Sequence, residues 1–463
     1  MYVSHHDLVI VGAGSGNSMI TPAMDGWSIG LVEKDVFGGT CLNRGCIPTK
    51  MLVHPADLAH DAADSARFGV RATFESADWV AIRNRIFGRI DPIAAGGRDY
   101  RMSLPNVTVY PAEGRFVGVR EMEADGHRFT ADRIVLAAGA RPMIPAVPGL
   151  DPALGPVVAF HTSDTVMRID ALPARLVILG GGFIANELAH AFRSLGSEVV
   201  IVNRSHRLLG AQDADISARY TELASQRYEL VLGATLQSVT SSGRWITVHL
   251  DAGRQITGDL LLVATGRIGN GDLLNPAATG LSVGPMREIA VDDYGRTGVD
   301  GIWAIGDVNG RHMLKHMANG EAQVVTHNLL HPNDLQCFES RPAPSAVFAS
   351  PQIGTVGMTA VAAPMHAVSI THDYGGAAWG WALEDTTSFC KLVGDPTTGL
   401  LLGAHIIGPQ ASTLVSLLVQ GMYLGNTVEQ MASDIVYIHP APSEVVEQAL
   451  LKLLDAFAAA STT

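Results

Sequence analysis

Cysteine is scarce in this chain: it occurs only four times among 463 residues, too seldom for a secreted fold held together by disulfides. Lysine and arginine (32) are outnumbered by acidic residues (45), and the resulting net charge of −13 argues against nucleic-acid binding. The sequence also lacks a basic run that would bind a membrane surface, a signal peptide in its polar residues 1–7, and the roughly 18 consecutive apolar residues of a membrane span. We therefore expect a cytoplasmic protein with no nucleic-acid or membrane partner.

Two of the four cysteines, Cys41 and Cys46, lie in the segment Gly38–Lys50, shortly after a glycine-rich motif. A pair with this spacing can close a small ring, so a disulfide between them can form and break with little movement of the backbone. Because the composition does not indicate a disulfide-stabilised fold, we interpret the pair as redox-active; the alternatives are a passive bridge or two buried thiols. Cys337 and Cys390 are isolated, and we expect them to be small buried side chains.

The glycine-rich motif GAGSGN, residues 12–17, stands between two short apolar runs, residues 8–11 and 29–32, which are typical of buried parallel strands. Glu33 follows the second run, about 20 residues after the motif. In such a unit a pyrophosphate lies at the N-terminus of the helix and the acid binds a ribose hydroxyl. Asn17 replaces the third glycine of the motif, and Pro22 falls inside the expected helix, so we expect that helix to be short or kinked.

A second unit of the same kind follows later in the chain. The apolar run 176–179 leads into GGGFIA, residues 180–185, which is the G-x-G-x-x-A form of the motif. We expect a helix at 186–195 and a strand at 199–202. Two dinucleotide motifs with a cysteine pair between them indicate two nucleotides joined by electron flow.

The segment Gly38–Lys50, GGTCLNRGCIPTK, resembles the redox segment of the flavin-dependent pyridine nucleotide-disulfide oxidoreductases. Residues 264–267 (ATGR), 301–307 (GIWAIGD) and 439–444 (HPAPSE) resemble further motifs of that family, in the family order. The resemblance implies an α/β fold with two Rossmann-like dinucleotide-binding domains, for FAD and NADPH, and a C-terminal α+β dimerisation domain. The expected regions are 1–145 (FAD, with the redox pair), 146–267 (NADPH), 268–337 (FAD, second part) and 338–463 (dimerisation), the last with a helix at 411–424.

The resemblance also implies the catalytic roles. Cys46 would be the sulfur beside the flavin and Cys41 the sulfur that attacks the substrate disulfide. Lys50 would approach the flavin and pair with Glu187, since a buried ammonium needs a partner. His439, oriented by Glu444, would act as acid and base at the cysteines of the other subunit, so the active enzyme would be a homodimer.

The cofactor-binding residues follow from the same resemblance and from the two glycine motifs. For FAD they are Gly12, Gly14, Gly16, Glu33, Thr40, Lys50, Gly139 and Asp307. For NADPH they are Gly180, Gly182, Ala185, Arg204, Arg207 and Gly266. We expect no metal.

The choice of NADPH rests on the end of the second strand of the second unit. NAD-selective relatives have an acid there, whereas this chain has Asn203 followed by Arg204. Arg204 matches the first of two basic residues in NADPH-using members; Gly210 occupies the second position, and Arg207 could substitute.

The substrate is indicated only by shorter stretches. Residues 14–18, 88–93, 161–167 and 373–385 resemble mycothione reductases, which favours a small-molecule disulfide, mycothione, as the substrate. Lys315 and His316 stand where glutathione reductases have Thr-Pro. The alternatives are an NAD-dependent dihydrolipoamide dehydrogenase, a glutathione reductase-like enzyme, or a redox-inert flavoprotein subunit. Trp379 and Trp381 could stack on a sugar ring or belong to a core or an interface.

Overall fold

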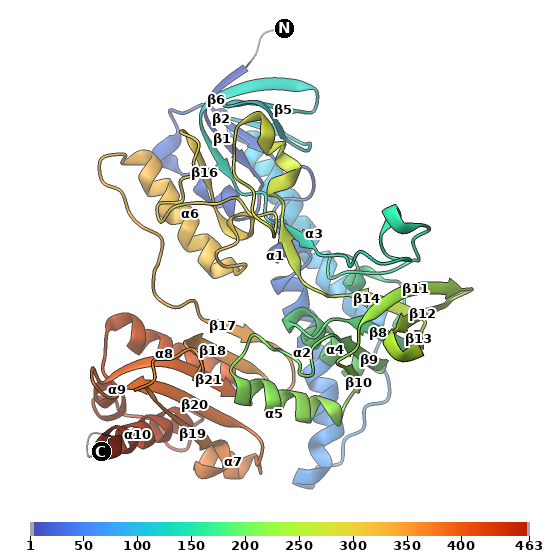
Figure 1. Ribbon diagram of the computed structural model, residues 1–463, viewed down its shortest axis with the longest axis vertical. Coiled ribbons are helices and arrows are strands. Elements are labelled where there is room, and N and C mark those ends of the chain that lie inside the picture. Colours follow the sequence, from blue (N-terminus) through green and yellow to red (C-terminus); the bar gives the residue numbers. More distant parts are fainter. Residues whose placement is uncertain (1–3, 461–463) are drawn as a thin grey trace.

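The computed structural model describes residues 4–460, so residues 1–3 and 461–463, at the ends of the first and last expected regions, lie outside it. The N-terminal part of the chain forms a seven-stranded sheet in the order β3-β2-β1-β6-β5-β4, with β16 also paired to β6 (Figure 1). Its central strands are parallel and its β4-β5-β6 ribbon is antiparallel. The strands are β1 (Ser4–Val11), β2 (Ile29–Val32), β3 (Val107–Tyr110), β4 (Arg115–Gly118), β5 (Glu121–Ala124), β6 (His127–Leu136) and β16 (Ile302–Ala304).

A second parallel sheet is built around the second glycine motif, with β8 before the motif and the other strands after it. Its order is β10-β9-β8-β14, and the antiparallel strands β11, β12 and β13 form a small sheet beside it. The strands are β8 (Arg175–Leu179), β9 (Glu198–Asn203), β10 (Glu229–Leu232), β11 (Leu236–Ser242), β12 (Trp245–Leu250), β13 (Gln255–Gly258) and β14 (Leu260–Val263); the helices are α4 (Phe183–Ser194) and α5 (Ala214–Ser225). A two-stranded ribbon, β7 (Ala140–Pro142) with β15 (Arg267–Gly269), joins the regions on either side of this unit.

Long helices link the two parallel sheets. They are α2 (Cys46–Asp64) and α3 (Trp79–Ser103), preceded by the short α1 (Gly39–Asn43); α6 (Lys315–Leu330) lies below the first sheet (Figure 1). Leu52 and Ala56 of α2 are buried in one core cluster with Leu188 and Phe192 of α4. This packing holds the start of α2, and therefore the cysteine pair, beside the second dinucleotide unit.

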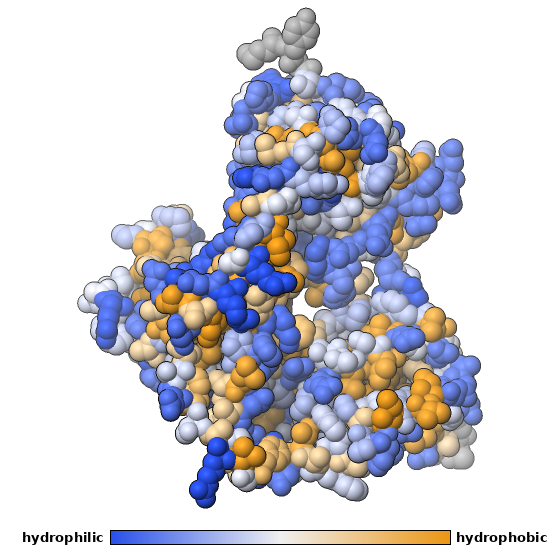
Figure 2. All heavy atoms as spheres, turned by 180° about the vertical axis from the view of Figure 1, so that it is seen from behind, coloured by the Kyte–Doolittle hydropathy of each residue, from blue (hydrophilic) through white to orange (hydrophobic). Residues whose placement is uncertain are grey.

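The C-terminal part is a five-stranded antiparallel sheet in the order β17-β18-β21-β20-β19, packed against helices α8, α9 and α10. Its elements are β17 (Ser345–Val347), β18 (Ile353–Gly357), β19 (Val368–Asp373), α7 (Ala378–Ala382), β20 (Phe389–Asp395), β21 (Leu400–Ile407), α8 (Ala411–Leu424), α9 (Val428–Ser433) and α10 (Ser443–Ala460). Figure 2 shows apolar patches on the surface of this C-terminal part. The exposed apolar side chains of the C-terminal part include Val361, Met365, Leu424, Val436 and Ile438. The α/β class and the C-terminal α+β unit are as predicted.

The first glycine motif differs from a standard dinucleotide unit. In place of the expected helix, short or kinked, the chain forms only two 3₁₀ helices, Ser15–Met19 and Pro22–Met24. Pro22 starts the second of them. Asn17 is held by α3: Arg101 Nε donates to Asn17 Oδ1 at 2.7 Å and Arg101 Nη2 donates to the Asn17 carbonyl at 2.6 Å. The side chain that replaces the third glycine therefore points to a partner on α3.

Candidate active site

A cleft of about 1220 Å³ brings together most of the expected FAD and redox residues. It lies between the carboxyl ends of the first sheet, the start of α6 and the segment 344–348. The expected residues that line it are Gly12, Gly14, Glu33, Thr40, Cys41, Cys46, Lys50, Gly139, Glu187 and Asp307. Gly16 is buried behind it, where an added Cβ would lie 2.8 Å from Ile10 Cγ2. Arg204, Arg207, His439 and Glu444 do not line it.

The backbone around the first glycine motif forms a tight cradle. Gly12 has φ +109°, and a Cβ on it would lie 2.2 Å from the carbonyl oxygen of Ala137, so only glycine fits. A Cβ on Gly39 would lie 2.8 Å from the Cα of Gly14, which shows how closely the two loops approach. Glu33 Oε2 accepts a hydrogen bond of 2.7 Å from the backbone N–H of Ala13, which fixes the carboxylate beside the motif. Burial raises the pKa of Glu33. The cradle fits a dinucleotide pyrophosphate.

The cysteine pair lies at the junction of α1 and α2. Cys41 belongs to α1 and Cys46 is the first residue of α2, and both are free thiols in the structure. A hydrogen bond between the sulfurs, with Cys41 as donor, lowers the pKa of Cys46 to about 7. The same contact, together with burial, raises the pKa of Cys41 well above its usual value. Cys46 is therefore the thiolate of the pair near neutral pH, and a helix N-terminus is a suitable place for one.

Lys50 and Glu187 lie near one another, but they do not form the ion pair that we expected between them. Instead, both contact Phe348: Lys50 Nζ lies 4.2 Å from the centre of its ring, and Glu187 Oε1 accepts a hydrogen bond of 2.9 Å from its backbone N–H. Burial raises the pKa of Glu187 to about 7. The hydrogen bond from Phe348 and the positive charge of Lys50 lower this pKa, but burial has the larger effect. Phe348 thus takes the place of a direct contact between the two side chains.

The second glycine motif begins with the same backbone geometry as the first. Gly180 has φ +116°, and a Cβ on it would lie 2.3 Å from the carbonyl oxygen of Ala264; Gly182 is the N-cap of the 12-residue helix α4, in which Ala185 is fully buried. Gly266 follows, with φ +130°. A regular helix N-terminus is therefore available to a pyrophosphate here, in contrast to the first motif.

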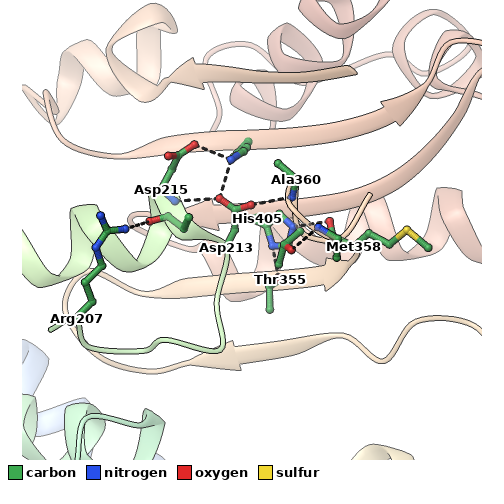
Figure 3. A network of polar contacts seen from close by, with 11 residues as sticks. Arg207, Asp213, Asp215, Thr355, Met358, Ala360 and His405 are labelled. Atoms are coloured by element: carbon green, nitrogen blue, oxygen red, sulfur yellow. Dashed lines mark hydrogen bonds and ion pairs between the residues drawn. The ribbon is translucent and has the colours of Figure 1, made fainter. Parts of the chain in front are cut away.

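The loop after β9 carries the two arginines expected to select NADPH. Asn203 donates its side-chain amide to the carbonyls of Ser205 (3.1 Å) and Arg207 (3.0 Å), which shapes the loop from within. The side chains of Arg204 and Arg207 are both exposed. Arg207 Nη1 donates to the carbonyl of Ala214, at the start of α5 (Figure 3).

A buried polar network joins the end of this loop to the C-terminal sheet (Figure 3). Asp213 is completely buried and accepts hydrogen bonds from Lys391 Nζ (2.7 Å), the Ala360 N–H (3.0 Å) and the Asp215 N–H (3.1 Å). Lys391, on β20 and only 6% exposed, also contacts Asp215 Oδ2 at 2.6 Å. Burial by itself would raise the pKa of Asp213, but Lys391 and the two N–H donors outweigh it and hold that pKa below its usual value.

His439 and Glu444 form a close pair on the C-terminal part. His439 Nδ1 and Glu444 Oε1 are 2.5 Å apart, and Glu444 Oε2 accepts from the Ala441 N–H. The imidazole is 70% exposed, whereas the carboxylate is 12% exposed, so the buried group orients the free one. Exposed apolar residues precede it, with Val436 95% and Ile438 74% exposed. The pair is preorganised but stands away from the cleft of its own chain.

Several cleft residues were not predicted as site residues. Phe348 gives no sequence signal, because its role depends on the approach of the C-terminal part to α2 and α4. Arg267, which ends the ATGR segment, donates to the Ala140 carbonyl and lies 3.5 Å from Asp164. Lys315, noted only as a departure from glutathione reductases, contacts Ser15 across 300 positions of the chain.

The two tryptophans differ. Trp379 packs against the C-terminal core beside Tyr374, whereas Trp381 is exposed and its indole N–H donates to the Gly375 carbonyl.

Over residues 4–460, the structure contains no helix with the length and apolar character of a membrane span, and no group of three or more His, Cys, Asp or Glu side chains placed to hold a metal.

Comparisons with known proteins agree with this architecture. The family model described as pyridine nucleotide-disulphide oxidoreductase matches residues 6–322, and the model for the dimerisation domain of that family matches residues 343–450. The chain is 45% identical over 461 residues to a mycothione reductase of Mycobacterium tuberculosis, covering 97% of this chain and 99% of the relative. It is 32% identical to a dihydrolipoyl dehydrogenase of Haloferax volcanii, with 96% and 95% covered. A solved flavoprotein disulfide reductase of Escherichia coli, RclA, superposes with a TM-score of 0.84 at 25% identity, with 96% and 99% covered. The chain therefore belongs to the pyridine nucleotide-disulphide oxidoreductases, flavoprotein disulfide reductases that use FAD and a nicotinamide nucleotide.

Proposed function

We propose that this protein is an NADPH-dependent mycothione reductase. The observation that carries the proposal is the near full-length similarity to mycothione reductases, together with a cleft in which a cysteine pair stands beside a dinucleotide cradle. Similarity to dihydrolipoyl dehydrogenases also spans the chain but at 32% identity, so the mycothiol disulfide is the favoured substrate.

FAD fits the first glycine motif, where Gly12, Gly14 and Gly39 let the backbone segments approach closely and form the cradle, Glu33 lies beside the motif and Asp307 lines the same cleft. When bound, FAD supplies two-electron transfer between the nicotinamide and the cysteine pair. Lys50, whose ammonium lies over Phe348 on the wall of the cleft, is assigned to the flavin end of the site.

The cysteines and His439 then carry the disulfide chemistry. Cys41 gives its proton to His439 Nε2 and attacks one sulfur of the substrate, which breaks the substrate S–S bond and forms a mixed disulfide. His439 returns the proton to the first leaving thiol, and Glu444 at Nδ1 stabilises the imidazolium in between. The Cys46 thiolate, favoured by its low pKa, attacks Cys41 Sγ. The Cys41–Cys46 disulfide forms, and the second thiolate leaves and takes up a proton.

We assign His439 and Glu444 to the active site of the partner subunit in a homodimer. They do not line the cleft that holds Cys41 and Cys46 of the same chain, and they lie within the residues matched by the dimerisation-domain model. The exposed apolar side chains Val436 and Ile438 next to His439 suit burial against a second copy.

The preference for NADPH is assigned to the loop after β9. Arg204 and Arg207 are exposed and β9 ends in the neutral Asn203, so a 2′-phosphate would meet two positive charges and no carboxylate at that strand end.

The test is a comparison of kcat/KM for mycothione, glutathione disulfide and dihydrolipoamide, each with the NADP(H) and the NAD(H) cofactor pair. We expect mycothione with NADPH to give the highest value. Arg204→Ala and Arg207→Ala should each raise KM for NADPH more than KM for NADH. A higher kcat/KM for either of the other two substrates would contradict the substrate assignment and leave the reaction class in place.

A further inference from the structure

The positive charges that line the cleft fall into two groups. Four are in ion pairs: Lys34 with Glu113, Arg44 with Asp35, Arg141 with Asp272 and Arg267 with Asp164. Among the described residues, Lys50 and Lys315 are the two lysine or arginine side chains of the cleft wall that have no carboxylate within 4.0 Å. Lys50 lies over Phe348 and is already assigned to the flavin end. Lys315 therefore presents to the cleft a positive charge that is in no ion pair with a carboxylate of residues 4–460.

The ammonium of Lys315 is directed to the first glycine motif. Its Nζ donates to Ser15 Oγ at 2.9 Å and to Asn319 Oδ1 at 2.5 Å, and both partners are neutral. Ser15 follows Gly14 directly and starts the 3₁₀ helix Ser15–Met19. Lys315 is itself the first residue of α6, a helix of 16 residues. The charge of the side chain and the positive end of α6 thus meet at the loop that cradles a pyrophosphate.

The first motif needs such a charge because its own helix is nearly absent. In a standard unit an α-helix N-terminus supplies partial positive charge to the pyrophosphate. Here the motif leads into a five-residue 3₁₀ helix, whose hydrogen-bond geometry is poorer and whose aligned dipole is small. The second motif leads into the 12-residue helix α4, whose N-terminus supplies this partial positive charge.

We propose that Lys315 is a cofactor-binding residue that holds the pyrophosphate of FAD and substitutes for the missing helix of the first motif. This inference rests on the FAD site proposed above. The rival role is electrostatic: Lys315 is close enough to the redox pair to lower the pKa of both Cys41 and Cys46. The two roles differ in what they change, because phosphate binding affects the retention of FAD, whereas an effect on the sulfurs changes only their titration.

The experiment measures the rate of FAD release from the purified holoenzyme, followed by flavin fluorescence, at several NaCl concentrations. We expect Lys315→Gln and Lys315→Met to release FAD about 10- to 100-fold faster than the wild type, as for loss of one hydrogen bond to a charged group. Lys315→Arg should stay within about threefold of the wild type, because the guanidinium also binds phosphate. Release from the wild type should accelerate with salt more steeply than release from Lys315→Gln. Lys452→Met, which removes the same charge from α10, is the matched control and should behave as the wild type.

A wild-type release rate in both Lys315→Gln and Lys315→Met would overturn the inference, whether or not the long-wavelength absorbance of the Cys46 thiolate beside the flavin titrates at a different pH. Two neutral variants are used so that a folding defect of one does not decide the result. Wild-type protein that purifies without FAD would instead contradict the FAD site itself, and the inference would fall with it.

Discussion

Replacing Lys391 by methionine should destabilise the protein strongly. Lys391 Nζ lies 2.7 Å from Asp213, a carboxylate with no exposed surface, so the variant leaves a buried charge with only two backbone N–H donors. Loss of one partner of a buried pair costs about 3–5 kcal/mol, and the lower end is expected here because those two donors remain. Urea unfolding, read by circular dichroism, measures the loss.

A double-mutant cycle separates this ion pair from the packing of the lysine stem. Asp213→Asn removes the charge and keeps an acceptor oxygen for one of the two backbone donors, so Lys391→Met should cost much less in that background, about 1–2 kcal/mol. The pH dependence has a definite sign. The folded pKa of Asp213 is below its ordinary value, so its stabilisation is present above the unfolded pKa and is lost as the pH falls through the folded pKa. Equal costs of Lys391→Met in both backgrounds would refute the reasoning.

Three further predictions concern the active site. Cys46→Ser should abolish the long-wavelength absorbance of the reduced enzyme, and Cys41→Ser should leave it visible before reduction; an absorbance that survives in Cys46→Ser would reverse the assignment. His439→Ala should slow disulfide turnover by roughly 100-fold or more while flavin reduction by NADPH keeps its rate, and mixing it with Cys41→Ser should restore activity in mixed dimers. No recovery after proven subunit exchange would contradict the shared site. Glu187→Gln should raise the free energy of unfolding by about 3 kcal/mol above pH 7 and by little below pH 4.5, because the raised pKa of Glu187 penalises its ionised form; a gain independent of pH would exclude this cause.

The sequence predicted the strands best where they are continuously buried. The runs 8–11, 29–32, 176–179 and 199–202 all lie within observed strands, because buried parallel strands are rich in Val, Ile and Leu. The helix expected at 411–424 has those same limits as α8. β1 begins earlier than expected, at Ser4, since its polar start pairs with β6 along a register that no local pattern reveals.

The candidate site was only partly predictable for a related reason. Glycine motifs and the cysteine pair could be recognised from the sequence, because each consists of a few residues that are close together in the chain. Contacts between distant segments have no such signal: Phe348 separates Lys50 from Glu187, and Lys315 reaches Ser15, only through the approach of whole elements. Pro22 indicated that the first helix would be short or kinked, but nothing in the sequence indicated that Arg101 would hold Asn17 by hydrogen bonds.

The location of His439 on the dimerisation domain has a consequence for mixed populations of subunits. If each active site takes its cysteines from one chain and its histidine from the other, a chain that carries both Cys41→Ser and His439→Ala inactivates both sites of any dimer it enters. Equal amounts of normal and doubly altered chains, paired at random, would leave only about a quarter of the dimers active. A copy of this protein that is defective at both residues would therefore act as a dominant inhibitor of the intact one, whereas a copy defective at only one of them would leave one working site in each mixed dimer.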